Sequence, residues 1–77
     1  MSRPVVLVTG ADLAKEAVEI LNGFEIIYAG KAPQPENVLA LCQLHNPIAI
    51  ILRYGGINAE MMDAAPNLRV ISKHGSG

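Results

Sequence analysis

Two segments of this chain, residues 5–8 and 48–52, are apolar without interruption. A strand with one face in water alternates apolar and polar side chains, whereas a strand that is buried on both faces is apolar throughout. Strands of the second kind occur in parallel sheets that helices cover on both sides. We therefore expect an α/β fold, with strands over residues 4–9 and 48–52.

Two further strands and three helices are predicted around these runs. Residues 24–29 and 68–72 contain Ile, Val and Tyr, which favour strands. Apolar residues recur at helical spacing over residues 13–22, 35–45 and 59–65, with polar residues between them. The chain is thus expected to alternate strand and helix from end to end.

Several residues are typical of helix boundaries. Asp12 and Asn58 can cap the first and third helices, because their side-chain oxygens accept from free amides. Pro35 suits the first turn of the second helix, where its missing N–H is not needed. Gly23 is expected to end the first helix, and His45 the second, where it complements the helix dipole.

The apolar helix residues are expected to face the sheet. They are Leu13, Ala14, Ala17, Val18 and Leu21 in the first helix, Val38, Leu39, Leu41 and Cys42 in the second, and Met61, Met62, Ala64 and Ala65 in the third. We interpret Cys42 as a small buried hydrophobe rather than a nucleophile, and Met61 and Met62 as core filler rather than a binding surface.

The βαβαβαβ order, with right-handed crossovers, predicts a parallel sheet with helices on both faces. We expect a flavodoxin-like sheet in the strand order 2-1-3-4, in preference to a Rossmann order. A complete sheet of this type has a fifth strand beside the fourth. Because no such strand occurs in this sequence, we expect an incomplete sheet whose fourth strand, residues 68–72, is an apolar edge.

Length and charge restrict the class of protein further. The 77 residues allow one small domain. The net charge is −1, and the sequence contains no block of like charge. This argues against nucleic acid or a membrane surface as a partner, and no apolar run is long enough to cross a bilayer. Cys42 is the only cysteine, so no intrachain disulfide can form and a reducing cytoplasm is expected.

A candidate binding site lies in the turns that follow the strands. Ligands bind at the carboxyl ends of the strands in an open parallel sheet. Two turns there, residues 53–56 and 73–77, combine a basic residue with glycines. Glycines allow amides to approach an anion, and an Arg can hold a carboxylate with two parallel hydrogen bonds. The turns predict a small-carboxylate site, although ordinary turns that need glycine geometry are an alternative.

Other motifs carry less chemistry. Residues 9–11 follow the first strand, but the Gly-x-Gly-x-x-Gly pattern of a dinucleotide loop is absent, so we interpret them as a structural turn. His74 lies in a glycine turn and is a functional candidate, although a surface role is the alternative. The two His residues and Cys42 lack the spacing of metal ligands.

Residues 50–58 and 61–77 resemble the N-terminal region of the D-isomer-specific 2-hydroxyacid dehydrogenases, in particular the phosphoglycerate dehydrogenase branch. Three features occur in the order seen in that family. A strand ends in a turn that contains Arg53, a short helix ends at Ala64 and Ala65, and an apolar strand enters a Gly-x-Gly turn at residues 75–77.

The resemblance implies that residues 1–77 are the N-terminal piece of the substrate-binding domain of an NAD-dependent oxidoreductase. That enzyme would act on the CH–OH group of a D-2-hydroxy acid, with 3-phosphoglycerate as one candidate. The substrate-binding residues that it implies, through the turn amides and the Arg side chain, are Arg53, Tyr54, Gly55, Gly56, Gly75, Ser76 and Gly77. The nucleotide-binding domain and the catalytic Arg, Glu and His of the family are absent, so we expect this chain alone to be inactive and to bind no NAD.

A second hypothesis belongs to another class of protein. The chain could be a stand-alone flavodoxin-like module that binds a partner or an anion and catalyses nothing. Under either hypothesis we expect a homo-oligomer, in which the exposed edge at residues 68–72 is covered by another copy.

Overall fold

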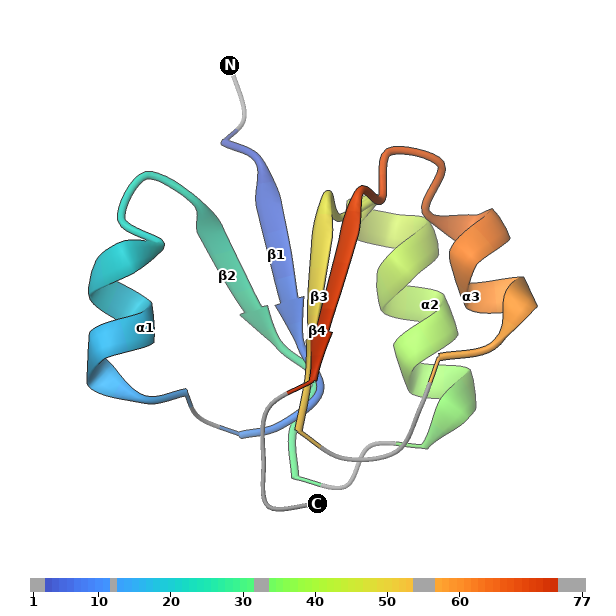
Figure 1. The fold of residues 1–77 in the computed structure, drawn as a ribbon. Coiled ribbons are helices and arrows are strands. Elements are labelled where there is room, and N and C mark those ends of the chain that lie inside the picture. Colours follow the sequence, from blue (N-terminus) through green and yellow to red (C-terminus); the bar gives the residue numbers. More distant parts are fainter. Residues whose placement is uncertain (1–2, 12, 32–33, 54–56, 74–77) are drawn as a thin grey trace.

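The computed structural model describes residues 3–11, 13–31, 34–53 and 57–73. Strand and helix alternate in it as predicted. The elements are β1 (Val5–Val8), α1 (Lys15–Ile20), β2 (Glu25–Tyr28), α2 (Pro35–His45), β3 (Ala49–Leu52), α3 (Ala59–Ala64) and β4 (Val70–Lys73). All strand pairs are parallel, and the sheet has the order β2-β1-β3-β4, which confirms the flavodoxin-like arrangement (Figure 1).

The register of the sheet aligns the ends of the strands. Val8 lies opposite Tyr28 in β2 and Ile51 in β3, and Leu52 lies opposite Lys73 in β4. The strands therefore end together at the lower side of the sheet in Figure 1, which we call the carboxyl edge. The opposite side, where the strands begin, is the amino edge.

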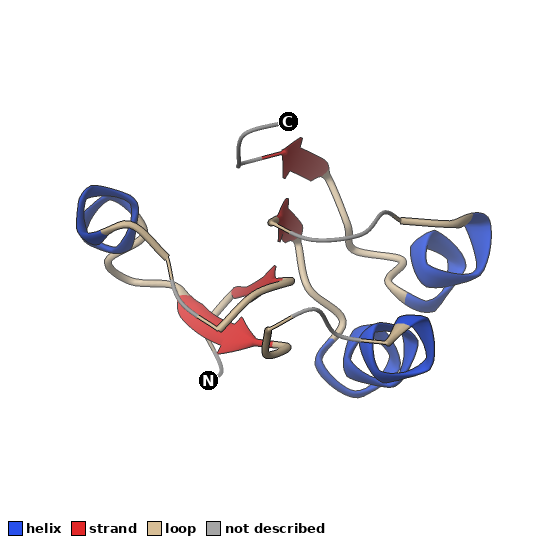
Figure 2. Ribbon diagram, turned by 90° about the horizontal axis from the view of Figure 1, so that it is seen from below, coloured by secondary structure: helices blue, strands red, loops and turns tan. Residues whose placement is uncertain are grey.

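Helices cover both faces of the sheet, with α2 and α3 on one face and α1 on the other (Figure 2). Leu7 and Ile50 form the core of the α2–α3 face together with buried residues of the two helices. Val6, Val8 and Ile51 form the core of the α1 face. Successive residues of β1 and β3 are thus buried on opposite faces, as their uninterrupted apolar sequences predicted.

The ends of two helices follow the predicted signals. Asn58 caps α3, because its Oδ1 accepts a hydrogen bond of 2.9 Å from the backbone N–H of Met61. Pro35 is the first residue of α2, and His45 is the last. Asn46 follows in the left-handed conformation, with φ 48° and ψ 62°, and its N–H donates to the carbonyl oxygen of Cys42. Asn is one of the few residues that adopt this conformation at low cost.

The first helix is shorter than predicted. It spans Lys15–Ile20, with Ala14 rather than Asp12 as the N-cap residue, and Asp12 itself lies outside the described residues. Leu13 already packs against the core of the α1 face before the helix begins, and Ala14 has no side-chain oxygen that could cap the helix. Gly23 follows the helix with φ 102°, a conformation that favours glycine.

Three apolar residues that we expected to face the sheet are exposed, namely Ala14, which precedes the first helical turn as its N-cap residue, Val18 and Met62. Met61 is buried, but Met62 is 46% exposed, so the interpretation of both methionines as core filler was wrong for Met62. Helix α3 has only six residues and directs Met61 and Ala65, four positions apart, into the core. Met62 lies one residue further round the helix and is therefore turned away from it. Val18 in α1 is 37% exposed for a comparable reason, since Leu13 and Leu21 make the contacts with the sheet.

Candidate functional site

The candidate site is the carboxyl edge, where Thr9 holds the ends of β1 and β3 together. Thr9 follows β1 and is 1% exposed. Its N–H donates to the carbonyl oxygen of Ile51 at 3.0 Å. Its Oγ1 accepts from the backbone N–H of Arg53 at 2.9 Å and donates to the carbonyl oxygen of Ile51 at 3.5 Å. The side chain of Thr9 therefore extends the connection between the two strands to the first residue after β3.

The side chain of Arg53 lies across the backbone of Gly10. A Cβ atom placed on Gly10 would be 3.2 Å from the Cβ of Arg53, 3.3 Å from its Cδ and 3.5 Å from its Cγ. The distances to the Cβ and Cδ of Arg53 are tighter than ordinary van der Waals contacts, so the absence of a side chain at Gly10 makes room for the aliphatic part of Arg53. Arg53 is half-buried as a result.

The turn after β2 is hydrogen-bonded to the backbone at the end of β1. The N–H of Ala29 donates to the carbonyl oxygen of Val8 at 2.8 Å, and the N–H of Gly30 donates to the carbonyl oxygen of Gly10 at 3.1 Å. Gly30 has φ 96°, a value that side chains other than hydrogen disfavour. Lys31 follows and is exposed. The ends of β1, β2 and β3 thus form one hydrogen-bonded unit around Thr9 and Gly10.

Three described cations of the carboxyl edge lie at the ends of strands, whereas Lys15 is the first residue of α1. Arg53 follows β3, Lys31 follows β2 after a short turn, and Lys73 is the last residue of β4, opposite Leu52. The nearby carboxylates in the described ranges are Glu16, Glu36 and Glu60. They lie in the first turns of the helices, where an acidic side chain complements the helix dipole. The strand ends are therefore the part of this edge that suits an anion.

The sequence-predicted site is described only in part. Arg53 is at the carboxyl edge, as predicted. The other predicted substrate-binding residues lie outside the described residues, namely Tyr54, Gly55, Gly56, Gly75, Ser76 and Gly77. The candidate His74 also lies outside them. Sequence reasoning missed the part played by Thr9, because it treated residues 9–11 only as a failed dinucleotide motif. The available signal was a hydroxyl residue at the end of a buried strand, immediately before a glycine.

Cys42, another candidate residue, has the surroundings of a core residue. Cys42 is fully buried in the core of the α2–α3 face, as predicted. This burial raises the pKa of the Cys42 thiol above its ordinary value, which disfavours the reactive thiolate.

Within the described ranges, His, Cys, Asp and Glu side chains form no group of three or more that could hold a metal ion. The same part of the chain contains no helix that is long and apolar enough to cross a membrane.

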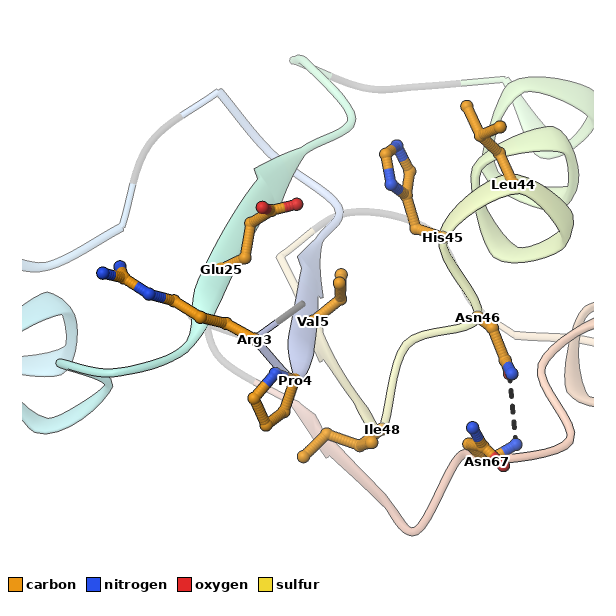
Figure 3. Close-up of a pocket in the computed structure, with 9 residues that line it drawn as sticks. All are labelled: Arg3, Pro4, Val5, Glu25, Leu44, His45, Asn46, Ile48 and Asn67. Atoms are coloured by element: carbon orange, nitrogen blue, oxygen red, sulfur yellow. Dashed lines mark hydrogen bonds between the residues drawn. The ribbon is translucent and has the colours of Figure 1, made fainter. Parts of the chain in front are cut away.

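An open groove of about 550 Å³ lies at the amino edge, far from the strand ends that carry Arg53 (Figure 3). Figure 3 shows the carboxylate of Glu25 and the imidazole of His45 on opposite sides of Val5. At the border of the groove, Oδ1 of Asn46 accepts a hydrogen bond of 3.2 Å from the N–H of Asn67. This bond joins the end of α2 to the turn before β4. We assign this groove no chemistry, since its polar groups do not converge on one point.

Comparison with known proteins bears on the class of the fold. No protein-family model and no curated protein sequence matches the chain. Among solved structures, the chain is similar to an NADPH-dependent glyoxylate/hydroxypyruvate reductase from Sinorhizobium meliloti, crystallised in complex with citrate. The TM-score is 0.64 at 29% sequence identity, and the match covers 100% of this chain and 23% of the reductase chain. The structural neighbour is thus a hydroxyacid reductase, and this chain spans less than a quarter of its length.

The described backbone after β1 is not open to a dinucleotide's pyrophosphate. A dinucleotide site needs glycine backbone that can approach the pyrophosphate closely in the turn after the first strand. The corresponding backbone here is that of Gly10, and the side chain of Arg53 already covers it. The turn after β1 is therefore occupied by the protein's own side chain.

Proposed function

We propose that this chain is the N-terminal part of the substrate-binding domain of a pyridine-nucleotide-dependent oxidoreductase. The substrate class is a D-2-hydroxy acid or the corresponding 2-oxo acid. The observation that carries the proposal is the similarity over the whole chain to a glyoxylate/hydroxypyruvate reductase. The resemblance of residues 50–58 and 61–77 to 2-hydroxyacid dehydrogenases, found in the sequence alone, supports the same class.

In this proposal the chain supplies part of the contact with the substrate carboxylate. Arg53 is the described residue suited to that role, because it ends a strand at the carboxyl edge and carries a guanidinium that matches a carboxylate. The turns at residues 54–56 and 75–77 contribute backbone amides in the same proposal. Chemistry at the C2 carbon belongs to residues outside this chain, so residues 1–77 alone are expected to be inactive.

A nucleotide-binding domain elsewhere in the enzyme would hold the cofactor, which supplies or accepts the hydride when bound. The sequence alone led us to expect NAD. Because the structural neighbour uses NADPH, the proposal is widened to a pyridine nucleotide of either kind. The class of reaction and the lone buried Cys42 are consistent with a cytoplasmic enzyme.

The test begins with the intact mass of the native protein that carries this sequence in its source cells. A protein several times larger than this chain is expected, and it is then assayed with glyoxylate, hydroxypyruvate and 3-phosphohydroxypyruvate, with NADH and NADPH separately. Oxidation of either cofactor that depends on one of these acids supports the proposal. A native protein of 77 residues, or a larger one that turns over none of these substrates, contradicts it.

One observation favours the second candidate, a non-catalytic module that self-associates. Strand β4 is an edge of the sheet, and Val70 and Ile71 on it are 55% and 37% exposed, with the 46% exposed Met62 also on this side of the fold. An apolar edge strand readily pairs with another strand. In this second proposal, a second copy of the chain covers β4.

The replacement Val70→Lys tests the self-association on which this second candidate depends. A charge on the edge strand opposes pairing with another copy, so a dimer formed through β4 is expected to become a monomer. Sedimentation at several concentrations measures the change, and Glu16→Lys on α1 is a control on the opposite side of the sheet. A wild-type monomer at all concentrations contradicts the self-association proposal.

A further inference from the structure

We propose that Thr9 and Gly10 form a seat for Arg53, which holds its guanidinium ready to bind the carboxylate of a small 2-oxo or 2-hydroxy acid. The inference rests on the proposed function and deepens it, because it names the residues that set the preference for a carboxylate. Thr9 and Gly10 are positioning residues that touch Arg53, and Arg53 touches the substrate.

Thr9 fixes the backbone of Arg53. The hydrogen bond from the N–H of Arg53 to Oγ1 of Thr9 is 2.9 Å long, and Thr9 is 1% exposed, so water does not compete freely for it. Through this one side-chain oxygen, the residue that follows β1 is hydrogen-bonded directly to the residue that follows β3. The position of the Arg53 Cα is therefore set by the core of the sheet rather than by the turn that follows.

Gly10 fixes the side chain of Arg53. Among the described glycines, only Gly23 and Gly30 have positive φ, and a Cβ at either of them would meet nothing within 4 Å. Gly10 differs from both, because its backbone does not require glycine but a Cβ there would crowd the Cβ and Cδ of Arg53. The residue that needs the glycine is thus Arg53, whose aliphatic part lies in the space that a side chain would fill.

Four described backbone amides next to Arg53 are already used within the protein and cannot bind the anion. The N–H groups of Thr9, Ala29, Gly30 and Arg53 all donate to protein acceptors. The guanidinium of Arg53 is a charged donor at the same strand ends, and its planar fork matches a carboxylate. A stem that is already immobilised loses less conformational entropy when the carboxylate binds. The ligand class that this arrangement selects is a small monocarboxylate, in preference to a neutral molecule of the same shape.

The test measures binding of oxamate, a small carboxylate, and of oxamide, its neutral analogue, to the native protein by calorimetry. Wild type is expected to prefer oxamate. Arg53→Gln removes that preference and weakens oxamate binding by about tenfold or more, the loss of a charge-assisted hydrogen-bonded pair. Thr9→Val and Gly10→Ala are expected to weaken oxamate binding by roughly three- to tenfold through misplacement of the guanidinium. Thr9→Ser, which keeps the hydroxyl, is expected to bind oxamate like wild type.

The double variants distinguish positioning from general loosening. If Thr9 and Gly10 act through Arg53, adding Thr9→Val or Gly10→Ala to Arg53→Gln causes no further loss. A purely structural role lowers the binding of oxamate and oxamide alike and adds to the effect of Arg53→Gln. Thr9→Val is nearly isosteric, so it serves as the test if Gly10→Ala does not fold.

Two failures can be told apart. If wild type binds oxamate no better than oxamide, the carboxylate role of Arg53 is wrong, and the seat has no function. If wild type and Arg53→Gln behave as expected but Thr9→Val and Gly10→Ala bind oxamate like wild type, the seat alone is wrong. In that case the proposed function stands without it.

Discussion

The hydroxyl of Thr9 accepts a hydrogen bond from the backbone N–H of Arg53, 44 positions further along the chain. The bond connects the first and third strands beyond their last paired residues, at the edge where parallel sheets bind ligands. It thereby links the buried core directly to the one predicted substrate-binding residue that the structure describes.

Thr9→Val is expected to lower the free energy of unfolding by about 1–3 kcal/mol, because it leaves the N–H of Arg53 without its acceptor in a partly buried position. Urea unfolding of the two proteins, followed by circular dichroism, measures the difference. Thr9→Ser is the matched control and should recover most of the loss, since it keeps the oxygen. Equal stability of Thr9→Val and wild type would show that water replaces the hydroxyl without cost.

The cap of α3 predicts a second change in stability. Asn58→Ala removes the acceptor for the N–H of Met61 and is expected to cost about 1 kcal/mol. Asn58→Ser, which keeps a capping oxygen, should lose much less. The two variants are compared by chemical denaturation, and an Asn58→Ala protein as stable as Asn58→Ser would contradict the importance of the cap.

Asn46 has two separable functions, since it adopts φ 48° and its Oδ1 accepts from the N–H of Asn67. Asn46→Gly loses the hydrogen bond but tolerates the left-handed backbone, whereas Asn46→Ala loses both. We expect the Ala variant to be less stable than the Gly variant by roughly 1 kcal/mol, the order of the left-handed strain. Thermal unfolding of both proteins measures this, and an Ala variant at least as stable as the Gly variant would refute the backbone explanation.

The buried thiol of Cys42 predicts a pH dependence. Burial raises its pKa above the ordinary value in the folded protein, so the unfolded chain releases the thiol proton at lower pH than the folded chain. The contribution of Cys42 to stability is therefore complete below the ordinary thiol pKa, about 8.5, and is lost as the pH rises above it. Denaturation at pH 7 and pH 9.5 should show a larger loss for wild type than for Cys42→Ala, and an equal loss would contradict the prediction.

Much of the fold was predictable because its signals are local. The uninterrupted apolar runs around Leu7 and Ile50 indicated strands buried on both faces, and the alternation of elements predicted the parallel order. Pro35 and Asn58 marked the starts of two helices, because the requirements of a first helical turn are met by single residues. The signals failed at Met62, where hydrophobicity predicted burial but a helix of six residues had only one face to bury.

The candidate site was predictable only in its position. The rule that ligands bind at the carboxyl ends of parallel strands led to Arg53. No sequence rule indicated that Thr9 and Gly10 would contact it, because the contact depends on the pairing of β1 with β3. The sequence indicated only that Gly10 lies in a structural turn, whereas the structure shows that its missing side chain leaves room for Arg53.

The sequence by itself determined the class of fold, the order of the elements, the starts of two helices and the end of one. These follow from periodicity and from the conformational limits of individual residues, which act over a few positions of the chain. Only the tertiary structure decided which residues meet at the carboxyl edge and what each of them does there. A hydrogen bond between Thr9 and Arg53, or the crowding of Arg53 against Gly10, exists only once parallel pairing has aligned strands that are distant in sequence.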